Sequence, residues 1–228
     1  MLISLHLPKT AGTSFRLTLE GVYGSRLLSD YDDMSAIQDY LSGEIDAKEL
    51  EKRKKISISI DVDCVHGHFL PMKYKSLEMG DKKRVFVTWL RDPFSRMVSH
   101  YHFFKRTYNP QYAGKLFRKV IEENWTLNHF CLSNEFRNIY TKYLVDFPLE
   151  DFSFVGITEY YNEDMIEFSK RFIGQAPELH HVNKSESNEA GKALADNALR
   201  QEVEAFHATD YDLYHRAIDA RNRRISNL

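Results

Sequence analysis

The chain has 228 residues, of which 43% are hydrophobic and 28% are charged. This length and balance fit one globular α/β domain with a substantial core. The formal net charge is −2 at pH 7, which argues against a nucleic-acid partner. No apolar run approaches the roughly 20 residues of a membrane span, and Cys64 and Cys131 lack the spacing of a zinc site or a disulfide scaffold. We therefore expect a single domain over residues 1–228, in the cytoplasm, with reduced thiols and no metal.

Strand-like and helix-like segments alternate along the chain. The predicted order is a strand at 2–7 (LISLHL) ended by Pro8, a helix at 13–20 stopped by Gly21, helical segments from 33 to 55, one or two short strands within 56–69, a buried strand at 84–90 (RVFVTWL), a helix from Pro93 to Arg106, and a buried strand at 152–158 (FSFVGIT). The final third is mostly helical, with a break near residues 177–188. Strands separated by helices predict a mainly parallel sheet covered on both faces. In such sheets, ligands bind at the carboxyl ends of the strands.

The loop after the first predicted strand carries residues suited to binding phosphate. It reads Pro-Lys-Thr-Ala-Gly-Thr-Ser over residues 8–14 and leads into the first helix. A helix N-terminus offers N–H groups and partial positive charge, and glycine lets the backbone approach an anion closely. Lys9 adds a full charge, and Thr13 and Ser14 add hydroxyl donors. The order differs from a Walker A loop, in which the lysine follows the second glycine, so a plain strand–helix turn is the alternative.

A second candidate site lies in WLRDPFSRMVSHYHF, residues 89–103. Asp92 is predicted to cap a helix that has Pro93 at its first position. An apolar stripe at helical spacing is predicted to be core; it consists of Phe94, Met97, Val98, Tyr101 and Phe104. Arg96 and Ser99 fall on the opposite face, and Arg91 stands at the carboxyl end of the strand. Arginine and serine together supply the charged and neutral donors that a phosphate dianion needs.

Together, the two segments resemble the cofactor motifs of sulfotransferases. PKTAGTSF resembles the loop that binds the 5′-phosphosulfate, and RDPFSRMVSHY resembles the 3′-phosphate motif RDPxxRxxSxY. VHGHF, FVGITE and HVNKSESN extend the similarity to about residue 190. The closest likeness is to carbohydrate sulfotransferases related to the heparan sulfate 2-O-sulfotransferases, which implies a P-loop-like fold and transfer of a sulfuryl group to a hydroxyl-bearing acceptor, a glycan or small glycoside.

The resemblance also implies a cofactor and the residues that hold it. The donor would be 3′-phosphoadenosine 5′-phosphosulfate (PAPS), the product 3′-phosphoadenosine 5′-phosphate (PAP), and no metal would take part. Residues that match the 5′ loop are Lys9, Thr10, Ala11, Gly12, Thr13 and Ser14. Arg91 and Ser99 match the pair that holds the 3′-phosphate. Asn183, Lys184 and Ser185 match a late loop that closes over the nucleotide.

A hydroxyl acceptor needs a base, and histidine is suited to that role near neutral pH. His66 and His68 stand in VHGH at the end of a predicted strand, where alternate residues point to the same face. On residue type alone, a hydrogen-bonded core or rim histidine is the favoured interpretation of either residue. The matching HGH segment of the 2-O-sulfotransferases carries the base, which implies His68 as the base and His66 in an assisting or substrate-binding role. His100 and His102 are the rivals, and His180 and His181 are weaker candidates.

Two other functions fit parts of the sequence. An ATP-dependent small-molecule kinase would use the same loops with magnesium, although Asp92 fits better as a helix cap than as a metal ligand. A non-catalytic nucleotide-binding protein would keep the loops without a base. The VHGH segment favours an enzyme over this second alternative.

Overall fold

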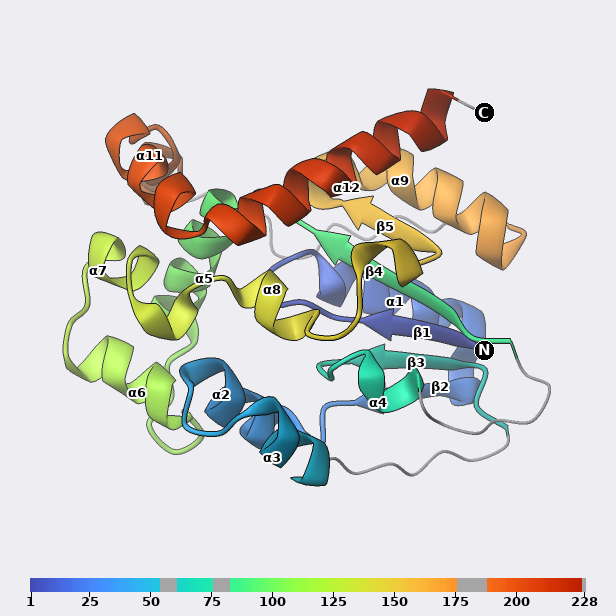
Figure 1. Cartoon of the computed structure of the whole chain (residues 1–228), viewed down its shortest axis with the longest axis horizontal. Helices are drawn as coiled ribbons and strands as arrows, with labels where there is room; N and C mark the ends of the chain where they lie inside the picture. Colours follow the sequence, from blue (N-terminus) through green and yellow to red (C-terminus); the bar gives the residue numbers. More distant parts are fainter. Residues whose placement is uncertain (54–60, 76–82, 176–187, 227–228) are drawn as a thin grey trace.

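The centre of the protein is a five-stranded parallel sheet. The computed structural model describes residues 1–53, 61–75, 83–175 and 188–226. The strand order is β2-β3-β1-β4-β5, and every neighbouring pair is parallel (Figure 1). The strands are β1 (Leu2–Leu5), β2 (Leu27–Asp30), β3 (Cys64–Gly67), β4 (Val85–Leu90) and β5 (Phe154–Ile157). The sequence-based prediction of an α/β fold with a mainly parallel sheet is confirmed.

Four of the strands lie within segments that the sequence predicts as strands. The described part of the segment 56–69 forms one strand, β3, while residues 54–60 are outside the described residues. The sequence analysis missed β2, which has the sequence LLSD. This strand sits at the edge of the sheet and buries only its last residue, Asp30. An edge strand therefore lacks the long apolar run by which buried strands are recognised.

Alternate residues of the strands enter two separate layers. Leu2, Cys64, Val87 and Phe154 pack against helices α1 (Gly12–Tyr23) and α9 (Tyr161–Phe168). The residues that follow Leu2 and Cys64, Ile3 and Val65, face the opposite core instead. Helices on that side are α2 (Met34–Ser42), α3 (Ala47–Arg53), α4 (Met72–Lys75), α8 (Ile139–Tyr143) and α12 (Ala208–Ser226). The parallel register aligns equivalent positions, so each face is continuous across the sheet.

A third apolar cluster lies beyond the carboxyl ends of the strands. It is built on α5 (Pro93–Thr107), and the predicted stripe of this helix is buried there. The other helices of this cluster are α6 (Lys115–Glu122), α7 (Leu127–Cys131), α10 (Asn188–Leu194) and α11 (Asn197–Phe206). Figure 1 shows the strand arrows pointing toward the side of the molecule where α2, α5, α6 and α7 lie.

Short turns of helix connect these elements. They are η1 (Gly24–Arg26), η2 (Asn134–Phe136), η3 (Leu149–Asp151), η4 (Thr158–Tyr160) and the π-helical η5 (Ser169–Ile173). Helix α1 runs past Gly21, where the sequence predicted its end, and stops at Gly24, whose φ is +53°. An interior glycine costs a helix only about 1 kcal/mol, and the burial of Phe15 and Leu19 on this helix offsets that cost.

Arg96 corrects a prediction about α5. The sequence pattern places Arg96 on the free face of the helix, but Arg96 is fully buried in the structure. Its guanidinium lies over the ring of Tyr140, 5.5 Å from the centroid. The reason is a contact between helices that the amphipathic pattern does not reveal, because the ring of Tyr140, on α8, covers the Arg96 side chain.

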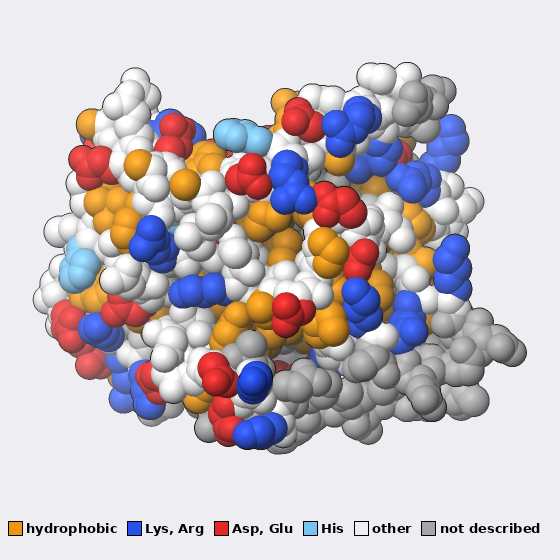
Figure 2. All heavy atoms as spheres, viewed as in Figure 1, with side chains coloured by type: hydrophobic (Ala, Val, Ile, Leu, Met, Phe, Trp, Pro, Cys, Tyr) orange, Lys and Arg blue, Asp and Glu red, His pale blue; other side chains and the backbone are white. Residues whose placement is uncertain are grey.

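The surface is mixed in charge and the cysteines are internal. Acidic and basic side chains are interspersed over the face drawn in Figure 2. Cys64 and Cys131 are both buried and free. Among the described residues, no helix combines the length and apolarity needed to cross a membrane.

Candidate active site

A large cavity opens at the carboxyl ends of the strands. Its volume is about 990 Å³, at the upper end of the range for small-molecule sites. The loop between β1 and α1, one side of α5, and the η4–α9 junction all contribute to its walls. The remaining walls come from α2, α6, α8 and α10. The parallel sheet thus places the two predicted anion sites in one cavity.

The β1–α1 loop has an unusual backbone conformation. Lys9 and Ala11 have φ values of +67° and +65°, in the left-handed region. Non-glycine residues adopt this region rarely and at some energetic cost, and such residues cluster at ligand-binding sites. Ala11 is also the N-cap of α1 and provides no side-chain cap to its first turn. The loop therefore directs an uncapped helix start and a lysine toward the cavity.

Most of the predicted loop residues line the cavity. Those that do are Lys9, Ala11, Gly12, Thr13 and Ser14. Thr10 does not: it is buried, and its hydroxyl donates to the Leu7 carbonyl at 2.9 Å. Because that bond ties the centre of the loop to the end of the strand, Thr10 supports the shape of the loop from within.

Gly12 has a different role from the one that its sequence pattern suggests. Its backbone is helical, while the turn itself is made by Lys9 and Ala11. A Cβ at Gly12 would lie 1.9 Å from Cδ2 of His6. The missing side chain therefore makes room for the His6 ring, which lines the cavity beside the loop.

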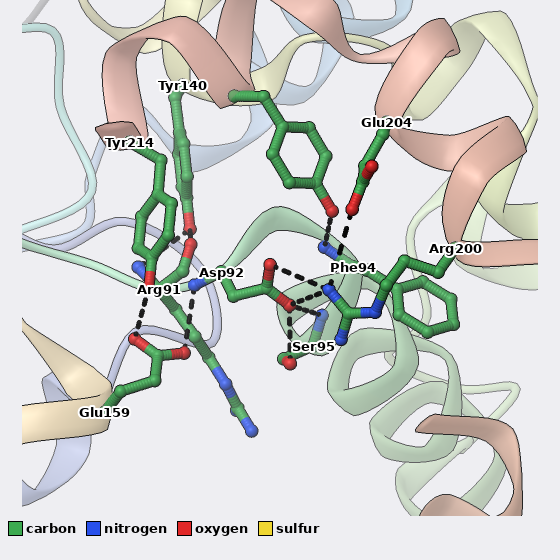
Figure 3. Close-up of polar contacts among 10 residues, drawn as sticks. Arg91, Asp92, Phe94, Ser95, Tyr140, Glu159, Arg200, Glu204 and Tyr214 are labelled. Atoms are coloured by element: carbon green, nitrogen blue, oxygen red, sulfur yellow. Dashed lines mark hydrogen bonds and ion pairs between the residues drawn. The ribbon is translucent and has the colours of Figure 1, made fainter. Parts of the chain in front are cut away.

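Arg91 reaches the loop from the end of β4. Its Nη1 donates to the Lys9 carbonyl at 3.5 Å, and the residue lines the cavity. Its backbone is fixed by the Tyr140 hydroxyl, which accepts from Arg91 N at 3.1 Å and donates to Arg91 O at 2.8 Å. Figure 3 shows the Arg91 side chain extending away from these backbone contacts. Tyr140 thus holds the backbone of Arg91 while its guanidinium is directed to the loop.

Asp92 caps α5 as the sequence predicts. Its Oδ1 accepts from the backbone N–H and the hydroxyl of Ser95, at 2.9 and 2.6 Å. The same carboxylate pairs with Arg200 at 3.2 Å, and Asp92 N donates to Glu159 at 3.0 Å (Figure 3). With its carboxylate engaged in these contacts, Asp92 orients the start of α5. Ser95 and the predicted Ser99 both line the cavity from this helix.

Three histidine rings are stacked next to the loop. His6 lies between the other two, with ring centroids 5.1 Å from His66 and 4.3 Å from His68. The interplanar angles are 21° and 24°. Nδ1 of His6 forms a 2.9 Å hydrogen bond with the hydroxyl of Tyr31, just after β2. The stack therefore joins residues of β1 and β3, and the hydrogen bond to Tyr31 links it to the end of β2.

The environment of His68 defines its tautomer. Its Nδ1 contacts the His6 carbonyl. A carbonyl can only accept, so Nδ1 carries the proton and Nε2 keeps the lone pair. Burial lowers the pKa of His68 from 6.5 to about 4, so the ring is neutral at physiological pH. His68 lines the cavity and can accept a proton there through Nε2.

The other candidate histidines are placed differently. His66 is buried, does not line the cavity, and hydrogen-bonds through Nδ1 to the Ser4 hydroxyl at 2.8 Å. Burial lowers its pKa to about 3. His100 lines the cavity and its Nδ1 is buried without a partner among the described residues, whereas His102 is not part of the lining. The other predicted residues lie outside the described part of the chain; they are His180, His181, Asn183, Lys184 and Ser185.

Lys9 combines strain with electrostatic stress. Its Nζ lies 4.1 Å from the centroid of the Phe103 ring. Burial, followed by repulsion from Arg106 and Arg91, lowers its pKa from 10.5 to about 8. A bound anion would offset both the burial and the repulsion, because it would hydrogen-bond to the Lys9 ammonium group and neutralise its charge. Clustered cations under such stress are a signature of an anion site.

Sequence reasoning missed His6 and the end of β5. His6 follows β1 directly, and its N–H donates to Gly67 O at 2.8 Å. The pairing of β1 with β3 therefore sets His6 beside His68. Thr158 and Glu159 also line the cavity, after β5. The sequence signal was a polar residue at the end of each strand, and using it requires knowing which strands are neighbours.

The structure of the chain is similar to solved structures, although its sequence matches no family model. No curated protein matches it either. A crystal structure of a sulfotransferase from Alicyclobacillus acidocaldarius aligns with a TM-score of 0.46 and 13% sequence identity, covering 92% of this chain and 91% of the other.

Among the described residues, no group of three or more histidine, cysteine, aspartate or glutamate side chains is arranged to hold a metal ion.

Proposed function

We propose that the protein is a sulfotransferase that moves the sulfuryl group of PAPS to an acceptor hydroxyl. The observation that carries this proposal is the single cavity lined by Lys9, Arg91 and His68. Two cations beside a strained strand–helix loop suit a doubly anionic nucleotide. A neutral histidine with a free ring lone pair suits the removal of a hydroxyl proton. The sequence resemblance to the two PAPS motifs names the nucleotide.

The residues divide into two groups around the donor. Lys9, Thr13, Ser14 and the start of α1 would hold the 5′ end, and Arg91 and Ser99 would hold the 3′-phosphate. The contact between Arg91 and the Lys9 carbonyl supports this assignment, because it joins both groups in one site. The late loop at residues 183–185 remains part of the proposal through the sequence resemblance alone.

In this proposal, His68 accepts the acceptor proton at Nε2. The His6 carbonyl accepts from Nδ1 at the opposite edge of the His68 ring, and this contact fixes the position of Nε2. PAPS supplies a sulfuryl group whose bond to the phosphate oxygen breaks as a bond to the acceptor oxygen forms. Lys9 would stabilise the negative charge that the phosphate gains, which is the usual contribution of a preorganised cation. His66 does not line the cavity and would assist His68 indirectly, by packing behind the His6 ring.

The first experiment is thermal unfolding with PAP, ADP or Mg-ATP. A ligand at 100 times its dissociation constant adds about 2.7 kcal/mol to stability. We expect PAP to raise the melting temperature more than ADP does, because only PAP fills both anion sites. Arg91→Ala should abolish most of this difference. Arg26→Ala is the matched control, since Arg26 is an exposed arginine that pairs with Asp63 at the amino end of the sheet.

The outcomes separate the three functions considered. Stabilisation by Mg-ATP alone would favour the kinase. The absence of any shift with PAP in the wild-type protein would contradict the sulfotransferase. Binding of PAP without transfer to any acceptor would favour the non-catalytic nucleotide-binding protein.

A further inference from the structure

The cavity extends well beyond the proposed nucleotide residues. Its second half lies under α2, α5 and α6, where the lining side chains are aliphatic or aromatic. They include Ile37, Leu41, Phe103, Leu116, Phe117 and Phe136. Figure 1 shows α2 and α6 on the same side of the molecule, beyond the strand ends. We call this part of the cavity the apolar half.

The apolar half adjoins the proposed reacting groups. The Phe103 ring touches the Lys9 ammonium group, with its centroid 4.1 Å from Nζ. On the other side, the Tyr143 ring lies 6.5 Å from the His68 ring, and Tyr143 also lines the cavity. A molecule that fills the apolar half would therefore reach both residues.

The wall of this half is a continuous aromatic cluster. Phe104 stacks on Phe117 with ring centroids 4.0 Å apart and an interplanar angle of 15°. Phe136 lies against the same cluster, 5.4 Å from His100. At the rim, Tyr112 is 84% exposed although it is a large apolar side chain. An exposed aromatic residue at the mouth of a cavity extends the apolar surface available to a ligand.

The charges of the lining do not suit an anionic glycan. Among the described lining residues, the lysine and arginine side chains are Lys9 and Arg91, both assigned to the nucleotide. The carboxylates are Glu135, Glu159 and Glu163. The polar side chains of the lining near the apolar half are few; they are Gln38, His100, Glu135 and Tyr143, and Glu135 already pairs with Lys119 at 2.8 Å. A sugar would leave most of its hydroxyls without partners here, at a cost of about 1–3 kcal/mol for each buried group.

From this geometry we propose that the acceptor is an uncharged alcohol or phenol with an apolar body. This inference rests on the proposed function and differs from the carbohydrate acceptor that the sequence resemblance implies. The apolar body would occupy the space under α2, α5 and α6, and the hydroxyl would face His68. The S–O bond of the donor breaks, the acceptor oxygen gains the sulfuryl group, and its proton passes to Nε2 of His68.

The test uses a series of 4-alkylphenols, from methyl to butyl, with ³⁵S-labelled PAPS. Each methylene that enters the apolar half should raise kcat/KM by about fourfold, the equivalent of burying one CH₂ group. An unsulfated uronate-containing disaccharide is the competing acceptor. Rates that rise along the series and exceed the rate for the disaccharide would support the inference.

Two variants locate the effect. Leu116→Asn should lower kcat/KM for butylphenol by about tenfold or more, because the ligand loses its apolar contact with the Leu116 side chain. Leu127→Asn is the matched control, because Leu127 packs on the same core cluster without lining the cavity. Both variants should keep their stabilisation by PAP, which also reports that they fold.

Failure of the inference and failure of the proposed function give different results. If PAP binds but the disaccharide is the better acceptor, or the phenol rates stay flat, the apolar acceptor is wrong and the sulfotransferase stands. If PAP does not stabilise the wild-type protein, the proposed function fails and the inference fails with it.

Discussion

At the scale of single residues, the cavity relies on backbone atoms to position side chains. The carbonyl of His6 sets the tautomer of His68, and the carbonyl of Lys9 accepts from Arg91. Gly12 lacks a side chain, which leaves space for the His6 ring. Backbone atoms cannot be deleted by mutation. Experiments that change the protonation of the His68 and Lys9 side chains are therefore informative.

Under the proposed function, the pH profile of sulfuryl transfer follows from two lowered pKa values, because the proposed reaction needs a neutral His68 and a charged Lys9. His68 must be neutral to accept a proton, and its pKa is lowered to about 4 by burial. Lys9 must be charged, and its pKa is lowered to about 8, mainly by burial. We expect kcat/KM to fall as pH drops through about 4 and to fall again as pH rises through about 8, since kcat/KM reports the free enzyme.

Steady-state kinetics from about pH 3.5 to about pH 9.5 would check this profile. In Arg106→Ala the basic limb should move upward, because Arg106 is a nearby charge that lowers the pKa of Lys9. The acidic limb should stay where it is. An acidic limb near 6.5, the pKa of an unperturbed histidine, would contradict the buried His68 as the base.

At the scale of elements, a buried ion cluster ties α4 to β2 and supports the histidine stack. Lys73 of α4 is 3% exposed and pairs with both Asp30 and Asp33 at 2.7 Å. These two carboxylates flank Tyr31 in sequence, and the Tyr31 hydroxyl bonds to His6. The cluster therefore fixes the segment that positions the central ring of the stack.

Removing the lysine from this cluster should destabilise the whole protein. Lys73→Met leaves two buried carboxylates without their cation, which costs about 3–5 kcal/mol. Lys75→Met is the matched control on the same helix, because Lys75 forms one exposed pair with Asp151 and such pairs contribute about 0–1 kcal/mol. Urea unfolding of both variants measures the difference. Equal losses would contradict the assignment of the cluster as a buried anchor.

At the scale of the whole molecule, stability depends on neutral histidines distributed through the core. His207 donates from Nε2 to the Cys131 carbonyl at 2.8 Å and accepts at Nδ1 from Asn138 N–H at 3.2 Å. Both ring nitrogens are engaged, so a second proton would remove the acceptor for Asn138. Burial is the largest cause that lowers the pKa of His207, to about 4.

The protein should therefore lose stability in mild acid. Between pH 6.5 and about 4 the unfolded chain binds a proton at His207 that the folded protein does not, so the free energy of unfolding falls as pH falls. The loss reaches about 3 kcal/mol for this residue, at about 1.4 kcal/mol per pKa unit. His66 and His68 act in the same direction, because burial lowers their pKa values too.

Urea unfolding at about pH 7 and about pH 4.5 measures this slope. His207→Gln should flatten it, while substitution of the exposed His215 by glutamine should leave it unchanged. An unchanged slope in His207→Gln would show that the acid sensitivity lies elsewhere.

The sequence alone determined the features that depend on local physical chemistry. Apolar runs gave β1, β4 and β5, the proline and aspartate at the start of α5 gave its cap, and the order of strands and helices gave the parallel class. Lys9 and Arg91 were also found this way, because each follows the end of a predicted strand, whereas His68 and the pairing of Ser99 with Arg91 came from the resemblance to the sulfotransferase motifs.

Only the tertiary structure decided which of these residues meet and what surrounds them. The pairing of β1 with β3 set His6 against His68, and Arg96 was buried where the ring of Tyr140 covers it. The edge strand β2 has no local sequence period and could not be recognised, and the composition of the segment from Phe103 to Phe136 suggested an acceptor pocket but not which side chains meet in its apolar half. Strand order and helix packing depend on contacts between residues far apart in the chain, and a local pattern holds no information about such contacts.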